Sequence, residues 1–157
     1  MGDNYIFFDP GEHTGWVSFD HKGDVIEMGT CNTQDQFYDF LADLHLGEFK
    51  VVGYEIFTLY PWKSQAQMWN EFITSQVIGA IKYAVHDYNS AIKAINSKEL
   101  IELVGQSANV MSMGYMYAGM EPPKSSNPLR HQLSAFAHGV YWLQNNGVRK
   151  PQQGRVK

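Results

Sequence analysis

Cysteine is nearly absent from the 157-residue sequence, which contains Cys31 alone. One thiol cannot form a disulfide within the chain or a metal site built of cysteines, so the sequence predicts a protein of the reducing cytoplasm. Apolar runs are also short, and none approaches the about 20 residues that a membrane-spanning helix needs. The opening residues, MGDNYIFFDPGE, carry acids where a secretion signal carries bases. We therefore expect no signal peptide and no membrane partner.

Acidic side chains are missing from the last 36 residues, because no Asp or Glu follows Glu121. That segment holds six of the twelve basic residues, whereas residues 1–121 hold all sixteen acids. The net charge of −4 therefore hides an acidic body joined to a basic end. Phosphate-binding surfaces are built from Lys and Arg, so this asymmetry favours contact with nucleic acid. A solubilising tail is the alternative interpretation of residues 151–157.

Size and composition predict a single globular domain. The hydrophobic fraction is 44% and the aromatic fraction 14%, both typical of a folded protein with one core. The chain contains no internal repeat and no linker long enough to separate two domains. We assign residues 1–147 to the domain and residues 148–157 to a basic C-terminal tail.

Apolar periodicity predicts the order β, β-hairpin, α, β, α, β, α. Short apolar or alternating runs predict strands at 5–8, 15–19, 25–31, 50–57 and 99–104. Helical spacing predicts one helix after Thr33, one over 62–89, and one from Pro128 to Gly147. The stretch over 107–128 is rich in Gly, Met and Pro and is predicted to be a long loop. The expected fold class is α/β, with a mixed sheet flanked by helices.

The long helix predicted over 62–89 has apolar residues at steps of three and four over more than five turns. Trp69 lies on this stripe, so it is expected to pack in the core. Phe72 and Ile78 lie off the stripe and predict a second, partly apolar face that could meet another subunit.

Two acids follow buried runs at the points where strands are expected to end. Asp9 ends the run YIFF and Glu55 ends KVVGYE. If these strands are neighbours in the sheet, the carboxylates lie side by side and repel one another unless a cation separates them. Oxygen-only sites of this kind suit Mg²⁺. The alternative is that either acid only caps a helix or accepts backbone hydrogen bonds in a loop.

The segments DPGEHTGW (9–16), VVGYE (51–55) and RHQLSAFAHGVYWL (130–143) resemble the RuvC-like branch of the ribonuclease H-like nucleases, especially the phage-type Holliday junction resolvases. The resemblance covers nearly the whole chain in the same order. It implies a ribonuclease H-like fold and a metal-dependent endonuclease that hydrolyses phosphodiester bonds in four-way junctions and other branched DNA. It also implies two Mg²⁺ ions per site, with Mn²⁺ as a possible substitute, a homodimer, and the host cytoplasm for a phage-encoded protein.

The same resemblance implies the site residues. Asp9 and Glu55 match the metal-binding acids of the first two site strands, and His131 matches the residue that opens the signature of the final helix. Ser134 stands where relatives have an Asp. Three interpretations are open: a natural member with little or no activity, an engineered replacement, or a shifted site completed by His131 and His138 that favours Mn²⁺ over Mg²⁺.

Four further residues are expected to contact DNA. Trp62 and Lys63 follow the Glu55 strand, where the indole could stack on an unpaired base. Lys124 and Arg130 lead into the final helix and could bind phosphates that flank the cut.

Two other functions are consistent with the sequence. The protein could bind branched DNA without cutting it. The pattern around Asp9, Thr14 and Gly15 is also shared with the phosphate-binding loop of actin-like ATPases, although those enzymes place nucleotide between two such domains and this chain has room for one.

Overall fold

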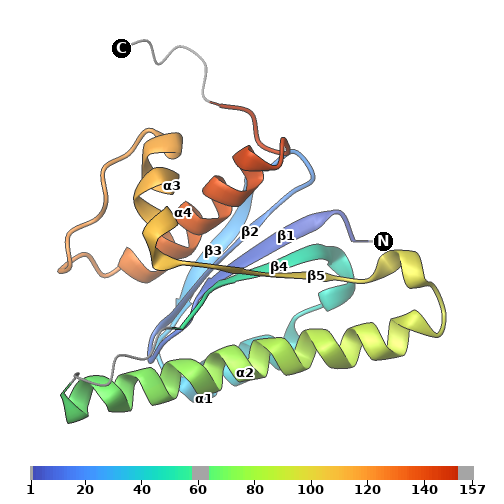
Figure 1. Ribbon diagram of the computed structural model, residues 1–157, viewed down its shortest axis with the longest axis horizontal. Coiled ribbons are helices and arrows are strands. Elements are labelled where there is room, and N and C mark those ends of the chain that lie inside the picture. The colour runs from blue at the N-terminus through green and yellow to red at the C-terminus, as the bar shows by residue number, and fades with distance from the viewer. Residues whose placement is uncertain (1, 58–63, 152–157) are drawn as a thin grey trace.

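A computed structural model describes residues 2–57 and 64–151 and shows a five-stranded sheet between two layers of helices (Figure 1). The strands are β1 (Asn4–Asp9), β2 (Thr14–Phe19), β3 (Val25–Cys31), β4 (Phe49–Glu55) and β5 (Glu102–Gln106). Their order in the sheet is β3-β2-β1-β4-β5. β1, β2 and β3 pair antiparallel, whereas β1, β4 and β5 pair parallel, so the predicted mixed α/β sheet is confirmed.

Alternation along β1 creates two hydrophobic cores, because successive side chains of a strand point to opposite faces. Ile6 and Phe8 belong to the core on the side of α1 (Gln34–Asp43) and α2 (Gln65–Lys93). Tyr5 and Phe7 belong to the core on the side of α3 (Met111–Ala118) and α4 (Arg130–Asn145). The site described below lies on the α3–α4 face.

Several predicted elements have the expected ends. Thr33 caps α1, and its hydroxyl oxygen accepts a hydrogen bond from the backbone N–H of Gln36 at 3.1 Å. Gly147, just beyond α4, adopts a φ of 73°, as expected of a glycine that follows a helix. β5 begins later than predicted, at Glu102, because residues Ser97–Glu99 form a short 3₁₀ helix.

The prediction of a long loop over 107–128 is wrong, because this stretch contains α3. The eight residues of α3 have no clear apolar period, and α3 is held instead by close packing. A Cβ atom built on Gly114 would lie 2.0 Å from the carbonyl oxygen of Ala137, so only glycine permits this crossing of α3 and α4. Gly119 then ends α3 with a φ of 70°.

The predicted core position of Trp69 is also wrong, because its side chain is 64% exposed. Ile78 is buried rather than part of a second face, and so are Val77, Ile81 and Val85. Figure 1 shows that the N-terminal part of α2 projects past the sheet, so its apolar residues find no core to cover. Phe72 lies in this part and is 55% exposed. Of the helices in the described residues, none combines the length and apolarity needed to cross a membrane.

Gly15 allows α4 to lie directly against β2. A Cβ atom at this position would lie 2.1 Å from both the carbonyl carbon and the carbonyl oxygen of His131. The obstacle is backbone, which cannot rotate away as a side chain can. The close approach of α4 to the sheet therefore requires glycine at position 15.

We predict that Gly15→Ala destabilises the protein by about 3 kcal/mol, the upper end of the cost of overpacking a core. Gly79→Ala is the matched control, because a Cβ atom there has no heavy atom within 4 Å and alanine favours the helix by up to about 1 kcal/mol. Urea denaturation measures the free energy of unfolding of both variants. Equal stability of the two variants would contradict the close approach at Gly15.

Candidate functional site

Two carboxylates lie at the ends of neighbouring parallel strands. β1 and β4 pair in register up to Phe8 opposite Tyr54, so Asp9 and Glu55 occupy the next position of each strand. Both acids continue the row of side chains that faces α4, because Asp9 follows Phe7 and Glu55 follows Val51 and Gly53 at steps of two. The sheet thus brings the two predicted acids together at one edge.

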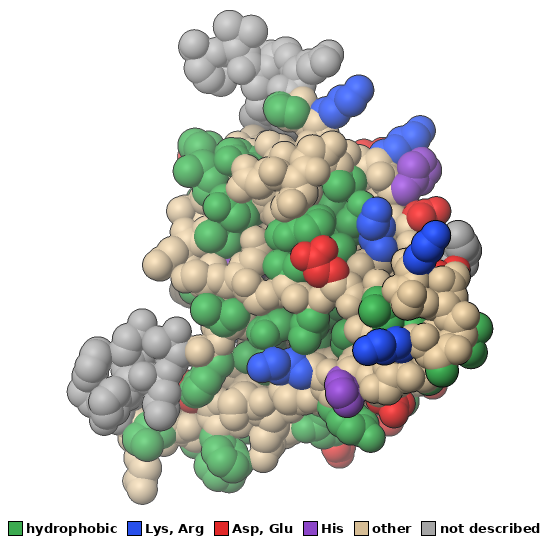
Figure 2. Space-filling model, turned by 45° about the vertical axis from the view of Figure 1, so that its right-hand side comes forward, with side chains coloured by type: hydrophobic (Ala, Val, Ile, Leu, Met, Phe, Trp, Pro, Cys, Tyr) green, Lys and Arg blue, Asp and Glu red, His purple; other side chains and the backbone are tan. Residues whose placement is uncertain are grey.

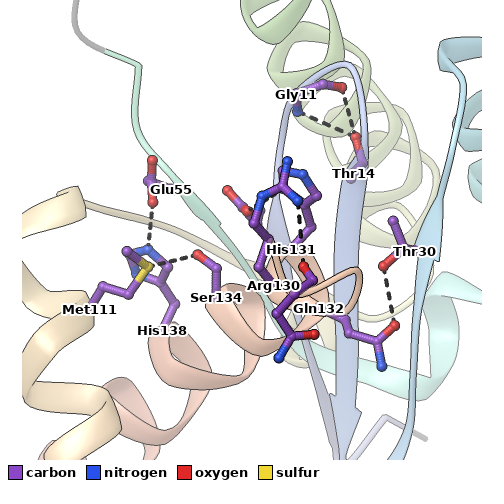
Figure 3. Close-up of polar contacts among 12 residues, drawn as sticks. Gly11, Thr14, Thr30, Glu55, Met111, Arg130, His131, Gln132, Ser134 and His138 are labelled. Atoms are coloured by element: carbon purple, nitrogen blue, oxygen red, sulfur yellow. Dashed lines mark hydrogen bonds and ion pairs between the residues drawn. The ribbon is translucent and has the colours of Figure 1, made fainter. Parts of the chain in front are cut away.

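Each carboxylate is paired with a histidine of α4. His131 Nδ1 lies 3.3 Å from Asp9 Oδ2, and His138 Nε2 lies 2.9 Å from Glu55 Oε1. The histidines are seven residues apart, about two helical turns, and so share one face of α4. Figure 3 shows the His138 ring directed at Glu55, with Ser134 on the turn between the two histidines. The sequence suggested His138 only as an additional ligand beside His131, whereas the structure pairs His138 with Glu55.

The turn after Asp9 is closed by Thr14. This buried hydroxyl donates to the carbonyl oxygen of Gly11 at 3.1 Å and accepts from the Gly11 N–H at 3.4 Å (Figure 3). His13 lies in the same turn, with its ring centroid 5.7 Å from that of His131. The motif DPGEHTG therefore combines an acid, a hydroxyl that fixes the turn, and the glycine that admits α4.

Burial and repulsion govern the electrostatics of the site. The pKa of Asp9 is raised above its ordinary value, first by burial and then by the nearby charge of Glu55, while the hydrogen bond from His131 opposes the shift. The pKa of Tyr115 is raised to about 12, first by burial and then by the charges of Asp9 and Glu55. Tyr115 is therefore a neutral phenol on α3 that lines the negatively charged end of the sheet.

Ser134 is engaged by α3. Its hydroxyl donates a hydrogen bond to the thioether sulfur of Met111 on α3, at 2.7 Å (Figure 3). Sequence reasoning missed Met111 and Tyr115 as site neighbours because it placed both in a loop. Their spacing of four residues, one helical turn, was the available signal.

Solved structures share this arrangement of sheet and helices. Thermus thermophilus RuvC in complex with Holliday junction substrate matches with a TM-score of 0.58 and 13% identity, covering 95% of this chain and 99% of that one. A second Thermus thermophilus RuvC structure matches with a TM-score of 0.54 and 15% identity, covering 90% of this chain and 96% of that one. No family model matches the sequence, and no curated protein matches it significantly.

The chain has a RuvC-like fold. At these identities the likeness establishes the fold alone. The predicted ribonuclease H-like architecture is confirmed on that basis.

The donor atoms at the end of this RuvC-like sheet suit one divalent cation. In residues 2–57 and 64–151, no three side chains of His, Cys, Asp and Glu form a ready-made metal cluster, and the acids are instead found in two separate pairs with histidines. Mutual repulsion of Asp9 and Glu55 is nonetheless the condition that a cation relieves. The two acids supply two negative charges, enough for one divalent ion, and Ser134 adds none.

The structure describes two of the four residues that are predicted to contact DNA. Arg130 is exposed at the start of α4, next to His131, and its guanidinium donates to the carbonyl oxygen of Asn127 at 3.4 Å. Lys124 is exposed in the connection between α3 and α4. Trp62 and Lys63 lie outside the described residues, so their predicted roles stay predictions.

A cavity of about 570 Å³ lies at the other end of the RuvC-like sheet. Lys50, Lys98, Asp3, Glu99 and Glu102 line it, so its charges are of both signs. In Figure 2, basic, acidic and apolar side chains are likewise interspersed over the visible face. A phosphate-binding site requires positive charge in excess, and this cavity has none, because its three acids outnumber its two lysines.

We predict that Asp9→Asn raises the free energy of unfolding at neutral pH by about 1 kcal/mol, because it removes a buried charge that repels Glu55. The charged form of Asp9 is the destabilised one, since its pKa in the folded protein is raised. The penalty is therefore full above the raised pKa and vanishes as the pH falls below the ordinary value of 3.8.

Chemical denaturation at several pH values, with the stability of Asp9→Asn compared with that of the wild type, tests this dependence. Asp87→Asn is the control, because it removes an equal charge from an exposed position of α2. A gain of stability that does not shrink toward acid pH would contradict the proposed cause.

Proposed function

We propose that this protein is a divalent-metal-dependent endonuclease that resolves four-way DNA junctions and other branched DNA. The observation that carries the proposal is the meeting of Asp9 and Glu55 at the ends of neighbouring parallel strands of a RuvC-like sheet. One structure with this fold is RuvC in complex with Holliday junction substrate, which supports the choice of DNA. Cys31 is buried and free, in keeping with a cytoplasmic protein.

Asp9, Glu55 and His131 would hold the cation, either Mg²⁺ or Mn²⁺. When bound, it supplies Lewis-acid activation of water and neutralises charge on the scissile phosphate. His131 Nδ1 lies 3.3 Å from Asp9 Oδ2, so the imidazole stands beside the carboxylate that it would join as a ligand. The Thr14 hydroxyl fixes the turn that follows Asp9, and α3 covers the site with Met111 and Tyr115, which limits access of bulk water. Hydrolysis would leave a 5′-phosphate and a 3′-hydroxyl.

Basic residues beside the carboxylates would bind the DNA backbone. Arg130 precedes His131 directly, and Lys124 lies in the connection that leads to it. Both side chains are exposed, which allows contact with phosphates on either side of the cut. We propose the same role for Lys63, and stacking on an unpaired base for Trp62.

The exposed part of α2 is the proposed dimer interface. Met68, Trp69 and Phe72 are 45%, 64% and 55% exposed, and the rings of Trp69 and Phe72 stack with centroids 6.0 Å apart. A four-way junction has two-fold symmetry, and a homodimer supplies one site for each of the two cuts.

Binding of branched DNA without cleavage is the second candidate function. Ser134 favours it, because its hydroxyl is neutral and is engaged with Met111 rather than with the carboxylates. A site with two acids in place of three holds metal less tightly and neutralises less of the developing charge.

We predict that the wild type cuts a labelled four-way junction slowly with Mn²⁺ and that Ser134→Asp cuts faster with Mg²⁺, because the added carboxylate is a hard oxygen ligand. Asp9→Asn and Glu55→Gln are expected to lose at least about 100-fold in rate while still binding the junction.

Ser97→Asp is the control for added charge, because Ser97 is exposed in a short 3₁₀ helix outside the site. Denaturing gels measure cleavage and mobility-shift gels measure binding. If both the wild type and Ser134→Asp bind junctions and neither cuts them, the non-cleaving function holds. If neither binds, both functions are wrong.

We predict that the double variant Trp69→Ser, Phe72→Ser raises the dissociation constant of the dimer at least about 30-fold, because buried aromatic residues dominate such interfaces. Light scattering over a range of protein concentrations measures the mass. Ile26→Ser is the matched control, since Ile26 is 54% exposed on β3 and lies outside α2. A wild type that stays monomeric with junction DNA present would contradict the interface.

A further inference from the structure

His138 occupies an unusual position for a histidine. Its side chain is fully buried, at 0% exposure, and the nearest polar partner of its ring is Glu55 Oε1 at 2.9 Å from Nε2. The backbone at this residue is fixed as well, because the buried side-chain amide of Gln106 donates to the His138 carbonyl oxygen at 2.9 Å. β5 and β4 thus hold the imidazole and the carboxylate against each other.

The other ring nitrogen of His138 is not used by the fold. Nδ1 is buried and has no hydrogen-bond partner in the described part of the chain. Burying an imidazole with an unsatisfied nitrogen costs free energy, so a buried histidine retained only for packing is a poor choice at this position. The imidazole contacts Glu55, which is one of the two candidate metal-binding acids.

The distances suit a shared cation. Two donor atoms that each lie about 2.1 Å from one ion lie about 3.0 Å apart when they meet at a right angle. The separation of 2.9 Å between His138 Nε2 and Glu55 Oε1 is close to this value. A cation could replace the hydrogen bond between them if the imidazole turned so that the Nε2 lone pair pointed at the ion instead of along the line to Glu55 Oε1.

Ser134 does not supply the charged metal ligand that an acid at position 134 would supply. Its hydroxyl is turned toward Met111, so the turn of α4 between the two histidines presents no charged ligand. His138 lies one helical turn further on the same face. Imidazole is a good ligand for Zn²⁺, and Mn²⁺ accepts it more readily than Mg²⁺, which prefers oxygen.

We propose that His138 Nε2 is a metal ligand that, together with Glu55, takes the place of the acid missing at position 134 and gives the site a preference for imidazole-accepting divalent cations over Mg²⁺. The inference rests on the proposed function, since it concerns the metal of that same site. It assigns one ion to the site rather than two. Because Nδ1 lacks the second partner that usually supports a metal-bound histidine, the affinity is expected to be lower by about 10- to 100-fold than that of a fully supported site.

Metal binding without DNA tests the proposal. In the full chain labelled with ¹⁵N-histidine, titration with ZnCl₂ is expected to shift the Nε2 resonance of His138, which is assigned from its absence in His138→Gln. The titration uses the wild type, and the variant serves only to assign the resonance. An unshifted Nε2 resonance at saturating Zn²⁺ would overturn the proposal.

Mn²⁺ affinity and Mg²⁺ competition, measured by electron paramagnetic resonance of free Mn²⁺, provide the second test. His138→Gln keeps an N–H that can donate to Glu55, so it separates ligation from hydrogen bonding. We expect it to lower Mn²⁺ affinity at least about tenfold and to reduce the selectivity for Mn²⁺ over Mg²⁺, whereas Ser134→Asp raises Mg²⁺ affinity.

Unchanged Mn²⁺ affinity and selectivity in a folded His138→Gln protein would show that His138 only donates a hydrogen bond, and would overturn the inference. The same holds if the wild type binds neither Mn²⁺ nor Zn²⁺. Failure of the proposed function itself is detected separately, by the absence of junction binding and of cleavage with any cation.

Discussion

The approach of α4 to the bare backbone of Gly15 is the constraint on which the candidate site depends. With no side chain at that position, the first turn of α4 rests on β2, and His131 reaches Asp9. The second close crossing, of Gly114 with Ala137, sets α3 against α4. Gly15 thus determines how closely α4 approaches β2, and Gly114 determines how closely α3 approaches α4.

Stability and function are opposed at the end of the sheet. Burial is the larger cost for the charged Asp9 carboxylate, and repulsion by Glu55 adds to it, yet the fold brings the two acids together. Histidine is the partner of both acids, a side chain that is neutral or charged according to its surroundings. A Lys or Arg in the same place would stabilise the fold and exclude a cation. Because histidine binds each acid less strongly than Lys or Arg would, a cation can take its place.

The sequence allowed the sheet and its two acids to be predicted, because strand alternation and element order are local properties. The chemistry of single residues likewise predicts that Thr33 caps α1 and that Asp9 ends β1. α3 was missed, because the four-residue spacing of Met111 and Tyr115 is its one apolar signal and its packing depends on a crossing with α4. Trp69 was assigned to the core because periodicity does not reveal where a sheet stops. The pairing of His138 with Glu55 depends on tertiary distance, so spacing along α4 could only suggest it.

The pairs at the site join opposite ends of the chain: 122 residues separate Asp9 from His131, and 83 separate Glu55 from His138. Contacts of such sequence separation form late in folding, because the closure entropy of a long loop must be overcome first. During synthesis, β1 and β4 leave the ribosome well before α4. A nascent or truncated chain therefore has the acids without their histidines, and the complete constellation arises only when the last helix docks.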